Sequence, residues 1–175
     1  MSQREIRLLL ISALKLEAHS VVWDIGAGTG TIPVEIGLIC PQGQIIAIER
    51  DEEVANLIKL NCDRFEVQNV QIVTGSAPHC LKQITTLPQR VCIEGGNALK
   101  PILQQVWEYL PITGRIVVTA DSLESLYEVS ESFTQLQARN VEVVQAAVNR
   151  LETRGTSRRF AAVDPIFILS AEKLE

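Results

Sequence analysis

The sequence predicts an α/β fold: a mostly parallel sheet with helices on both faces and an antiparallel hairpin near the carboxyl end. Three observations predict it. Short apolar runs alternate with segments of helical periodicity along most of the 175 residues. The first apolar run leads directly into a glycine-rich turn. The last two strand-like runs follow each other without a helical pattern between them, so we expect them to pair antiparallel.

The first half of the chain supplies two strands and three helices. Ser2 is placed as the N-cap of an opening helix, with Glu5 as its capping-box partner. A strand is expected over 20–25, a helix over 31–39 and a second strand over 44–49. Asp51 is expected to cap the next helix. One face of that helix is apolar and carries Val54, Leu57, Ile58 and Cys62.

The second half continues the alternation and then breaks it. Strands are expected over 70–73, 90–93 and 115–120, with helices near 98–110 and 123–136. The final strands, 141–148 and 161–169, are joined by 151–159, a polar segment with one glycine that we expect to be a connection. Pro165 cannot donate to a sheet ladder and therefore needs a bulge or a strand edge.

Length and composition restrict the class of protein. Residues 1–175 fit one domain, and 46% of them are apolar. A net charge of −5 argues against a nucleic-acid partner. No apolar run is long enough for a membrane span and no secretory signal is evident, so the cytoplasm is the expected location. No metal is expected, because the cysteines and histidines lack the spacing of metal ligands. These residues are Cys40, Cys62, Cys80, Cys92, His19 and His79.

The turn after the first strand is a candidate ligand site. Its sequence is Asp24-Ile-Gly26-Ala-Gly28-Thr-Gly30, and glycines there allow a ligand to approach the backbone closely. A dinucleotide fingerprint would place a sixth-position glycine where Thr31 stands, so an NAD site is disfavoured. Asp24 instead suits a cationic cofactor that carries a sulfonium and an amino group. The alternative is a plain strand-to-helix turn.

Glu49 closes the second strand about 20 residues beyond this turn. An acid at this position can accept hydrogen bonds from both hydroxyls of a ribose, so an adenosine is implied. The alternative is a solvated carboxylate at a strand end.

Together these residues resemble class I S-adenosylmethionine-dependent methyltransferases. The similarity covers the Asp24–Gly30 turn, Glu49 and Gly75-Ser76-Ala77. It implies a Rossmann-like fold with a seven-stranded sheet and S-adenosylmethionine as cofactor. The glycine turn would support the methionine part, Glu49 the ribose, and Ser76 and Ala77 the adenine. The implied cofactor residues are Ser2, Asp24, Gly26, Ala27, Gly28, Thr29, Gly30, Glu49, Arg50, Ser76 and Ala77.

A narrower resemblance is to the decarboxylating precorrin methyltransferases of cobalamin synthesis, which methylate carbon 15 of a corrin precursor. The segments that carry it occur in the same order: 4–7, 14–16, 22–30, 47–50, 75–78, 114–117 and 164–167. The sequence departs from that family at Ser76, where Asp is common, and at 94–97, where the family has a longer glycine run. The family's proline-rich lead-in is missing, although Ser2 matches its cofactor-contacting hydroxyl residue.

This resemblance implies methyl transfer to carbon with loss of an acetate carboxyl group from a tetrapyrrole. Such a displacement at a sulfonium needs alignment and desolvation rather than a catalytic dyad, so no catalytic residue is assigned. The carboxylates of the substrate would find bidentate donors in Arg150, Arg154, Arg158 and Arg159, unless these form a solvated face. Gly95, Gly96 and Asn97 would admit the substrate closely, unless they form a plain turn that Asn97 caps.

Other functions remain open on the sequence. A nucleic-acid or protein methyltransferase of the same fold is the second candidate, although 94–97 lacks the Pro-Pro-aromatic segment of base-amine methyltransferases. A non-catalytic cofactor-binding module and an NAD-linked oxidoreductase are the others. The resemblance also suggests a homotetramer with the hairpin as a contact, and a companion carbon-5 methyltransferase as a partner.

Overall fold

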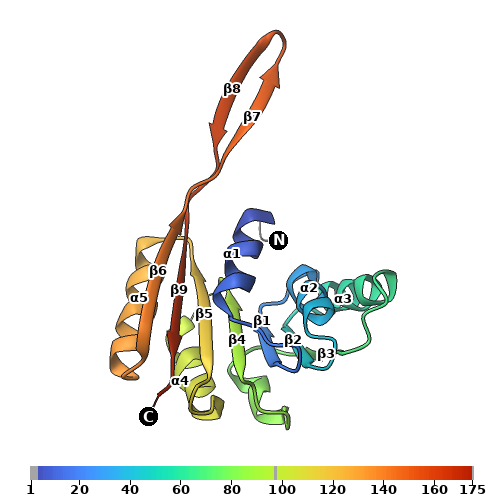
Figure 1. The fold of residues 1–175 in the computed structure, drawn as a ribbon, viewed down its shortest axis with the longest axis vertical. Helices are drawn as coiled ribbons and strands as arrows, with labels where there is room; N and C mark the ends of the chain where they lie inside the picture. The colour runs from blue at the N-terminus through green and yellow to red at the C-terminus, as the bar shows by residue number, and fades with distance from the viewer. Residues whose placement is uncertain (1–3, 97, 175) are drawn as a thin grey trace.

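The computed structural model describes residues 4–96 and 98–174. Its main sheet has seven strands in the order β3-β2-β1-β4-β5-β9-β6 (Figure 1). The strands β1 to β4 pair parallel with their neighbours, as do β4 and β5, whereas β9 runs antiparallel to both β5 and β6. The bounds are β1 Val21–Ile25, β2 Gln44–Glu49, β3 Val70–Thr74, β4 Arg90–Glu94, β5 Arg115–Ala120, β6 Arg139–Ala146 and β9 Ile166–Glu172.

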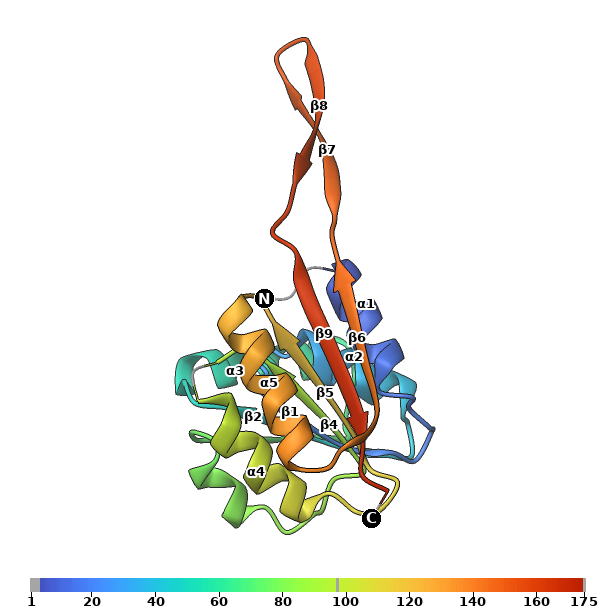
Figure 2. The ribbon, with the colours of Figure 1, turned by 90° about the vertical axis from the view of Figure 1, so that its left-hand side faces the viewer.

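Helices cover both faces of this sheet. In Figure 2, α4 and α5 lie in front of the strands, and α1 and α2 lie behind them. One apolar core packs α4, α5 and the short 3-10 helix η1 against the sheet, and two others pack α1, α2 and α3 against the opposite face. The bounds are α1 Arg4–Ala13, α2 Thr31–Ile39, α3 Glu52–Arg64, η1 His79–Gln83, α4 Leu99–Tyr109 and α5 Leu123–Gln135.

The central strands form because their apolar runs are buried on both faces. Trp23 is fully buried on the α4 side, whereas its neighbour Val22 is fully buried on the α1 side. This two-sided burial is typical of parallel strands under crossover helices. The predicted alternation and the mostly parallel seven-stranded sheet are therefore confirmed.

Local capping explains where two of the helices begin. The carboxylate of Asp51 accepts from the amides of Glu53 and Val54, at 2.9 and 3.1 Å, which satisfies free N–H groups at the start of α3. The predicted cap is confirmed. Ser122 and Ser125 form a reciprocal capping box that begins α5.

The carboxyl-terminal part differs from the prediction. β6 and β9 do pair antiparallel. The connection expected over 151–159 is instead a second, two-stranded sheet of β7 (Asn149–Arg154) and β8 (Ser157–Ala162). Gly155, with a φ of +61°, begins the two-residue turn between them, so this glycine marks a hairpin rather than an irregular loop.

The expected strand 161–169 is accordingly divided between β8 and β9, and Pro165 lies in the interruption, where no ladder hydrogen bond is lost. β6 also ends at Ala146 rather than at 148. The short helix η1 was not predicted. Ser2 and its capping role lie outside the described residues, as does Asn97; the N-cap position of α4 is Ala98.

The β7–β8 hairpin projects from the body of the molecule (Figure 1). It leaves from the edge of the sheet at which β5 ends, since Ala120 pairs with Phe167 and Ala146 with Ile166. The amide of Val163 donates to the carbonyl of Val148 at 2.9 Å and joins the hairpin to the strands below it. Within the described residues, no helix is long and apolar enough to cross a membrane.

Candidate functional site

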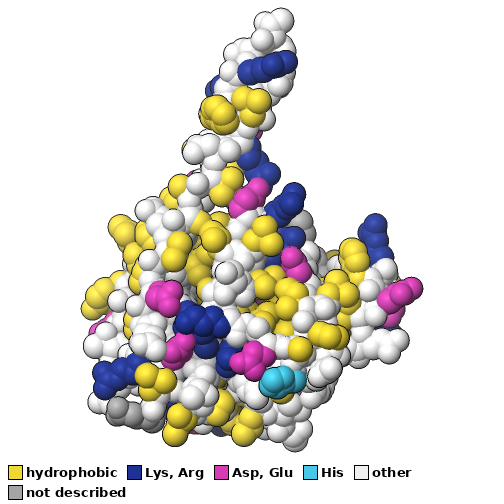
Figure 3. Space-filling model, in the orientation of Figure 1, with side chains coloured by type: hydrophobic (Ala, Val, Ile, Leu, Met, Phe, Trp, Pro, Cys, Tyr) yellow, Lys and Arg dark blue, Asp and Glu magenta, His cyan; other side chains and the backbone are white. Residues whose placement is uncertain are grey.

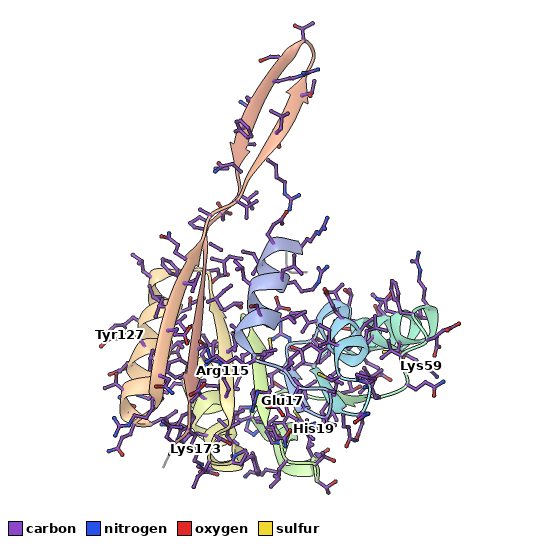
Figure 4. All side chains as sticks on the ribbon, in the orientation of Figure 1. Glu17, His19, Lys59, Arg115, Tyr127 and Lys173 are labelled. Carbon is purple, nitrogen blue, oxygen red and sulfur yellow. The ribbon has the colours of Figure 1, made fainter. Side chains whose placement is uncertain are left out.

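The candidate site lies where the strand order reverses, between β1 and β4. The helix that follows β1 packs on one face of the sheet and the helix that follows β4 packs on the other. In open α/β sheets this arrangement leaves a crevice at the carboxyl ends of the strands, and ligands bind there. His19 is labelled at the opposite edge in Figure 4, so it does not belong to the site.

The glycine turn closes over the end of β2. The amides of Gly26 and Ala27 both donate to the carbonyl of Ile48 at 3.0 Å, and Asn61 of α3 donates to the carbonyl of Thr29 at 2.8 Å. A side chain at Gly26 would place its Cβ 2.8 Å from the carbonyl oxygen of Glu94, and the φ of Gly26 is +83°. Only glycine fits there without strain.

Glu49 is held in place by backbone amides. Its Oε2 accepts from the amide of Gly28 at 2.9 Å, and its Oε1 accepts from the amides of Arg50 and Asp51 at 2.9 and 3.1 Å. A carboxylate has about four acceptor positions, so roughly one remains for a ligand hydroxyl. The carboxylate is half-buried at the edge of the crevice.

Asp24 is fully buried beneath the glycine turn. Neither of its carboxyl oxygens makes a full hydrogen bond to a described residue. Burial and the nearby carboxylates of Glu94 and Glu49 raise the pKa of Asp24 well above its usual value, and the weakly donating thiol of Cys92 offsets this only in part. A buried acid without a partner is costly, so this position favours a ligand that brings a cation or a donor.

Two adjoining hollows occupy the crevice. The first, of about 440 Å³, extends from Gly26 past Glu49 and Arg50 to Ser76 and Ala77. The second, of about 270 Å³, lies over the glycine turn. Four residues line both hollows, and we call them the shared wall: Gly26, Glu94, Gly95 and Asp121.

Most of the predicted site residues meet in these hollows. Arg50, Ser76, Ala77 and Gly96 line the first hollow, as does Glu49. The second hollow is lined by Ala27, Gly28 and Thr29. Asp24 and Gly30 do not line either hollow. A Cβ at Gly30 would clash with Ile58 of α3, at 2.8 Å from its Cγ2, so this glycine allows α2 and α3 to pack. Ser2 and Asn97 lie outside the described residues.

The prediction missed three side chains of the site. Glu94 and Asp121 belong to the shared wall, and Thr119 lines the second hollow and accepts from the amide of Gly95 at 3.2 Å. All three stand at the ends of β4 and β5. An acid that directly follows a buried parallel strand is a signal that could have found Glu94 and Asp121.

The predicted arginines lie on the hairpin and are divided between its faces. Cross-strand register pairs Arg159 with Glu152 and Arg158 with Thr153. Because side chains alternate along a strand, Arg150 and Arg159 share one face, whereas Arg158 lies on the other. Arg154 ends β7 opposite Ser157.

Arg150 lies nearest the body, since its Nη2 contacts Oε2 of Glu5 in α1 at 2.6 Å. The described side chains of Arg150, Arg158 and Arg159 line neither hollow. Figure 3 shows dark-blue basic side chains along the hairpin and beside its base.

Comparison with known proteins gives one consistent result. A family model described as a precorrin methyltransferase domain matches residues 1–173. The cobalt-precorrin-6B C(15)-methyltransferase (decarboxylating) of Salmonella typhimurium is 30% identical over 176 residues, which cover 100% of this chain and 90% of that protein.

Two crystal structures extend the similarity. Precorrin-6y C5,15-methyltransferase from Geobacter metallireducens superposes with a TM-score of 0.91 at 31% identity, over 99% of this chain and 91% of that one. Precorrin 8w decarboxylase from Methanobacterium thermoautotrophicum gives a TM-score of 0.87 at 25% identity, over 98% and 91%. The resemblance and the fold class drawn from the sequence are confirmed, and this chain belongs to the precorrin methyltransferase domain family.

Proposed function

We propose that this chain is an S-adenosylmethionine-dependent C-methyltransferase that methylates carbon 15 of a corrin precursor, with loss of the carboxyl group of an acetate side chain, in cobalamin biosynthesis. The observation that carries the proposal is a full-length match to the family combined with an acidic crevice at the carboxyl edge of the sheet. The named activity of the Salmonella relative supplies the position on the ring and the decarboxylation.

The residues of the crevice fit this cofactor. Asp24 is a buried carboxyl group without a full hydrogen bond, and the positive charge of the cofactor's amino group would offset part of the cost of its burial. Glu49 retains an acceptor position for a ribose hydroxyl, and Ser76 and Ala77 would border the adenine. When bound, the cofactor supplies an electrophilic methyl group on a positively charged sulfur.

The protein contributes position and charge. Asp24, Glu49 and Glu94 border the crevice or lie beneath it, and carboxylates stabilise a bound cation. The tight turn at Gly26 fixes where the cofactor's reactive end would stand relative to the shared wall. An electron-rich ring carbon attacks without a general base, so the chain has to align it and exclude water.

The substrate's outer carboxylates would be bound by the arginines of the hairpin. Arg150 is the best placed, because its contact with Glu5 keeps it at the base of the hairpin on the site's edge of the sheet. Arg159 shares that face. Arg158 lies on the other face and would bind a carboxylate only from that side. Bidentate guanidinium contacts suit a ligand with many carboxylates.

A homotetramer built through the hairpin is part of the proposal. An isolated two-stranded ribbon is marginally stable in water, and this one exposes 59% of Leu151 and 74% of Phe160, which are cross-strand partners. A companion enzyme for carbon 5 is a further part of the proposal. The Geobacter protein is named for both positions, whereas the Salmonella protein is named for carbon 15 alone.

One experiment tests the function directly. Purified protein is incubated with S-adenosylmethionine and the cobalt-containing or metal-free precorrin intermediate. The masses of the products are then measured by mass spectrometry. We expect a gain of one methyl group with loss of carbon dioxide. Cofactor binding without modification of any tetrapyrrole would overturn the substrate, and RNA and protein acceptors would then be tested. Absence of cofactor binding would overturn the whole proposal.

A further inference from the structure

The shared wall lies where the two hollows meet, and it carries the carboxylates of Glu94 and Asp121. Adenine and ribose would occupy the part of the first hollow bordered by Ser76, Ala77 and Glu49. The reactive end of the cofactor would therefore reach Gly26 and Gly95, which belong to the shared wall. The acceptor has to meet it there, so the side chains of Glu94 and Asp121 would face the substrate.

The two acids differ in what they face. Glu94 is half-buried, and its charge raises the pKa of the buried Asp24, so it lies toward the cofactor's amino end. Asp121 is exposed and follows Ala120, which pairs with Phe167 of β9 at the base of the hairpin assigned to the substrate. Asp121 therefore lies on the acceptor side of the wall.

The position of Asp121 is fixed by its neighbours along the chain. Ala120 is paired with Phe167 of β9, and Ser122 forms the capping box of α5. A residue held between a central strand and a capped helix has a fixed backbone position, which confines its carboxylate to this end of β5. A group that acts on a reacting centre is best carried by such rigid elements.

The proposed reaction breaks the bond between the methylene carbon of the acetate side chain and its carboxyl carbon. Carbon dioxide leaves, the electron pair of that bond stays with the methylene carbon and the conjugated ring, and this carbon takes a proton from water to become a methyl group. One negative charge is thereby removed from the side chain. A fixed anion beside the departing carboxylate favours this loss, because like charges close together are costly.

We propose that Asp121 is a catalytic residue of the decarboxylation, with its carboxylate placed against the acetate carboxylate that is lost; this inference rests on the proposed function. The repulsion is present in the bound substrate and is relieved as carbon dioxide forms. The hairpin arginines, which hold the other carboxylates of the substrate, supply the binding energy that offsets it.

The test compares Asp121→Asn with wild type for methyl transfer and carbon dioxide release from the corrin precursor. We expect carbon dioxide release to slow by about tenfold or more, KM for the tetrapyrrole to fall, and a methylated product that retains its carboxyl group to accumulate. A fall in both kcat and KM is the signature of ground-state repulsion, and a purely structural role would not produce it. Asp121→Glu should recover part of the rate.

The matched control is Asp164→Asn, which removes one charge from an exposed residue near the same edge and should leave both steps unchanged. Calorimetry should show unaltered binding of S-adenosylmethionine to Asp121→Asn. If this variant releases carbon dioxide at the wild-type rate, or if only KM rises, the inference is overturned while the proposed function stands. A wild-type protein that binds cofactor but modifies no tetrapyrrole overturns both.

Discussion

The amide of Gly28 donates to Oε2 of Glu49 at 2.9 Å, so the turn after β1 and the acid that ends β2 form one unit without any ligand. Two further amides, of Arg50 and Asp51, fix the other carboxylate oxygen. The side chain of Glu49 therefore does not have to be ordered when a ribose binds. Such preorganisation lowers the entropy lost on binding.

Replacing Glu49 with alanine should weaken binding of S-adenosylmethionine by roughly tenfold to a hundredfold. Hydrogen bonds to a charged group contribute about 1.5–3 kcal/mol, and the glycine turn also loses its support. Isothermal titration calorimetry measures the change. Glu52→Ala is the control, because it removes the same charge from an exposed residue of α3 and should bind cofactor normally. Unchanged affinity in Glu49→Ala would remove this residue from the site.

Binding of the cofactor should depend on pH through Asp24. Burial, with Glu94 and Glu49, raises the pKa of this carboxyl group, so it is protonated at pH values below the raised pKa. A cation requires the ionised form. Affinity should therefore rise with pH through the raised pKa, with release of a proton. Calorimetry in two buffers of different ionisation enthalpy counts that proton, and Asp24→Asn should abolish the dependence.

The same acid affects the stability of the empty protein. Because its pKa is raised on folding, the folded state binds more protons than the unfolded state at pH values between the usual pKa of 3.8 and the raised one. This group's contribution to stability is thus present at low pH and is lost as the pH rises through the raised pKa. The free energy of unfolding, measured with denaturant at several pH values, should therefore fall as the pH rises. This fall should be smaller in the presence of cofactor.

Substitution of Gly26 by alanine should destabilise the fold by about 1–3 kcal/mol. Its φ of +83° is unfavourable for alanine, and the new Cβ would lie 2.8 Å from the carbonyl oxygen of Glu94. Gly155→Ala is the matched control, since φ there is +61° but no atom lies within 4 Å of the added Cβ. The control should cost less in urea unfolding, because it carries only the conformational penalty of about 1–2 kcal/mol. Equal losses in the two variants would contradict the steric explanation.

Sequence patterns predicted the sheet and placed most candidate site residues at its carboxyl edge, because both depend on local chemistry. Residues 21–25 are apolar except for Asp24, which is typical of a strand buried on both faces of the sheet. The one acid in it therefore had to lie next to the glycine turn. Glu49 could be placed because parallel strands end at the same edge.

The meeting of the missed acids in one wall depends on tertiary arrangement. Asp121 joins Glu94 only because β4 and β5 are neighbours, and no spacing in the chain states this. The β7–β8 strand pair was missed for a different reason. Its strands are polar on most positions, and charged residues such as Arg150 and Glu152 concealed the alternation around Leu151 and Phe160.

Arg115 should prove important for stability. It is 1% exposed, and its guanidinium donates to Glu172 and Ser170 at 2.7 and 2.8 Å and to the carbonyl of Ala13. Figure 4 labels it beneath α1. Arg115→Met should lower the free energy of unfolding by about 3 kcal/mol, because the buried acceptors lose their partner. Arg139→Met, at an exposed position of β6, should change it little.

The pH dependence of this cluster provides a second check. Hydrogen bonds from Asn140, then Lys15 and Arg115, lower the pKa of Glu172 below its usual value of 4.5. A lowered pKa means that the stabilisation is present above 4.5 and is lost as the pH falls through the lowered value. The acid-dependent part of the unfolding free energy should therefore be smaller in Arg115→Met. An identical acid profile in the two proteins would show that Arg115 and Glu172 are not coupled.

The position of the hairpin has an evolutionary consequence. Its two strands leave and re-enter the sheet between the paired residues Ala146 and Ile166, so the ends of the segment 147–165 lie side by side. Such a segment can be lengthened, shortened or exchanged without altering the register of β6 and β9. A protein with this sheet could thus accept substrates of a different size by changing the hairpin alone, while the crevice at the ends of β1, β2 and β4 stays as it is.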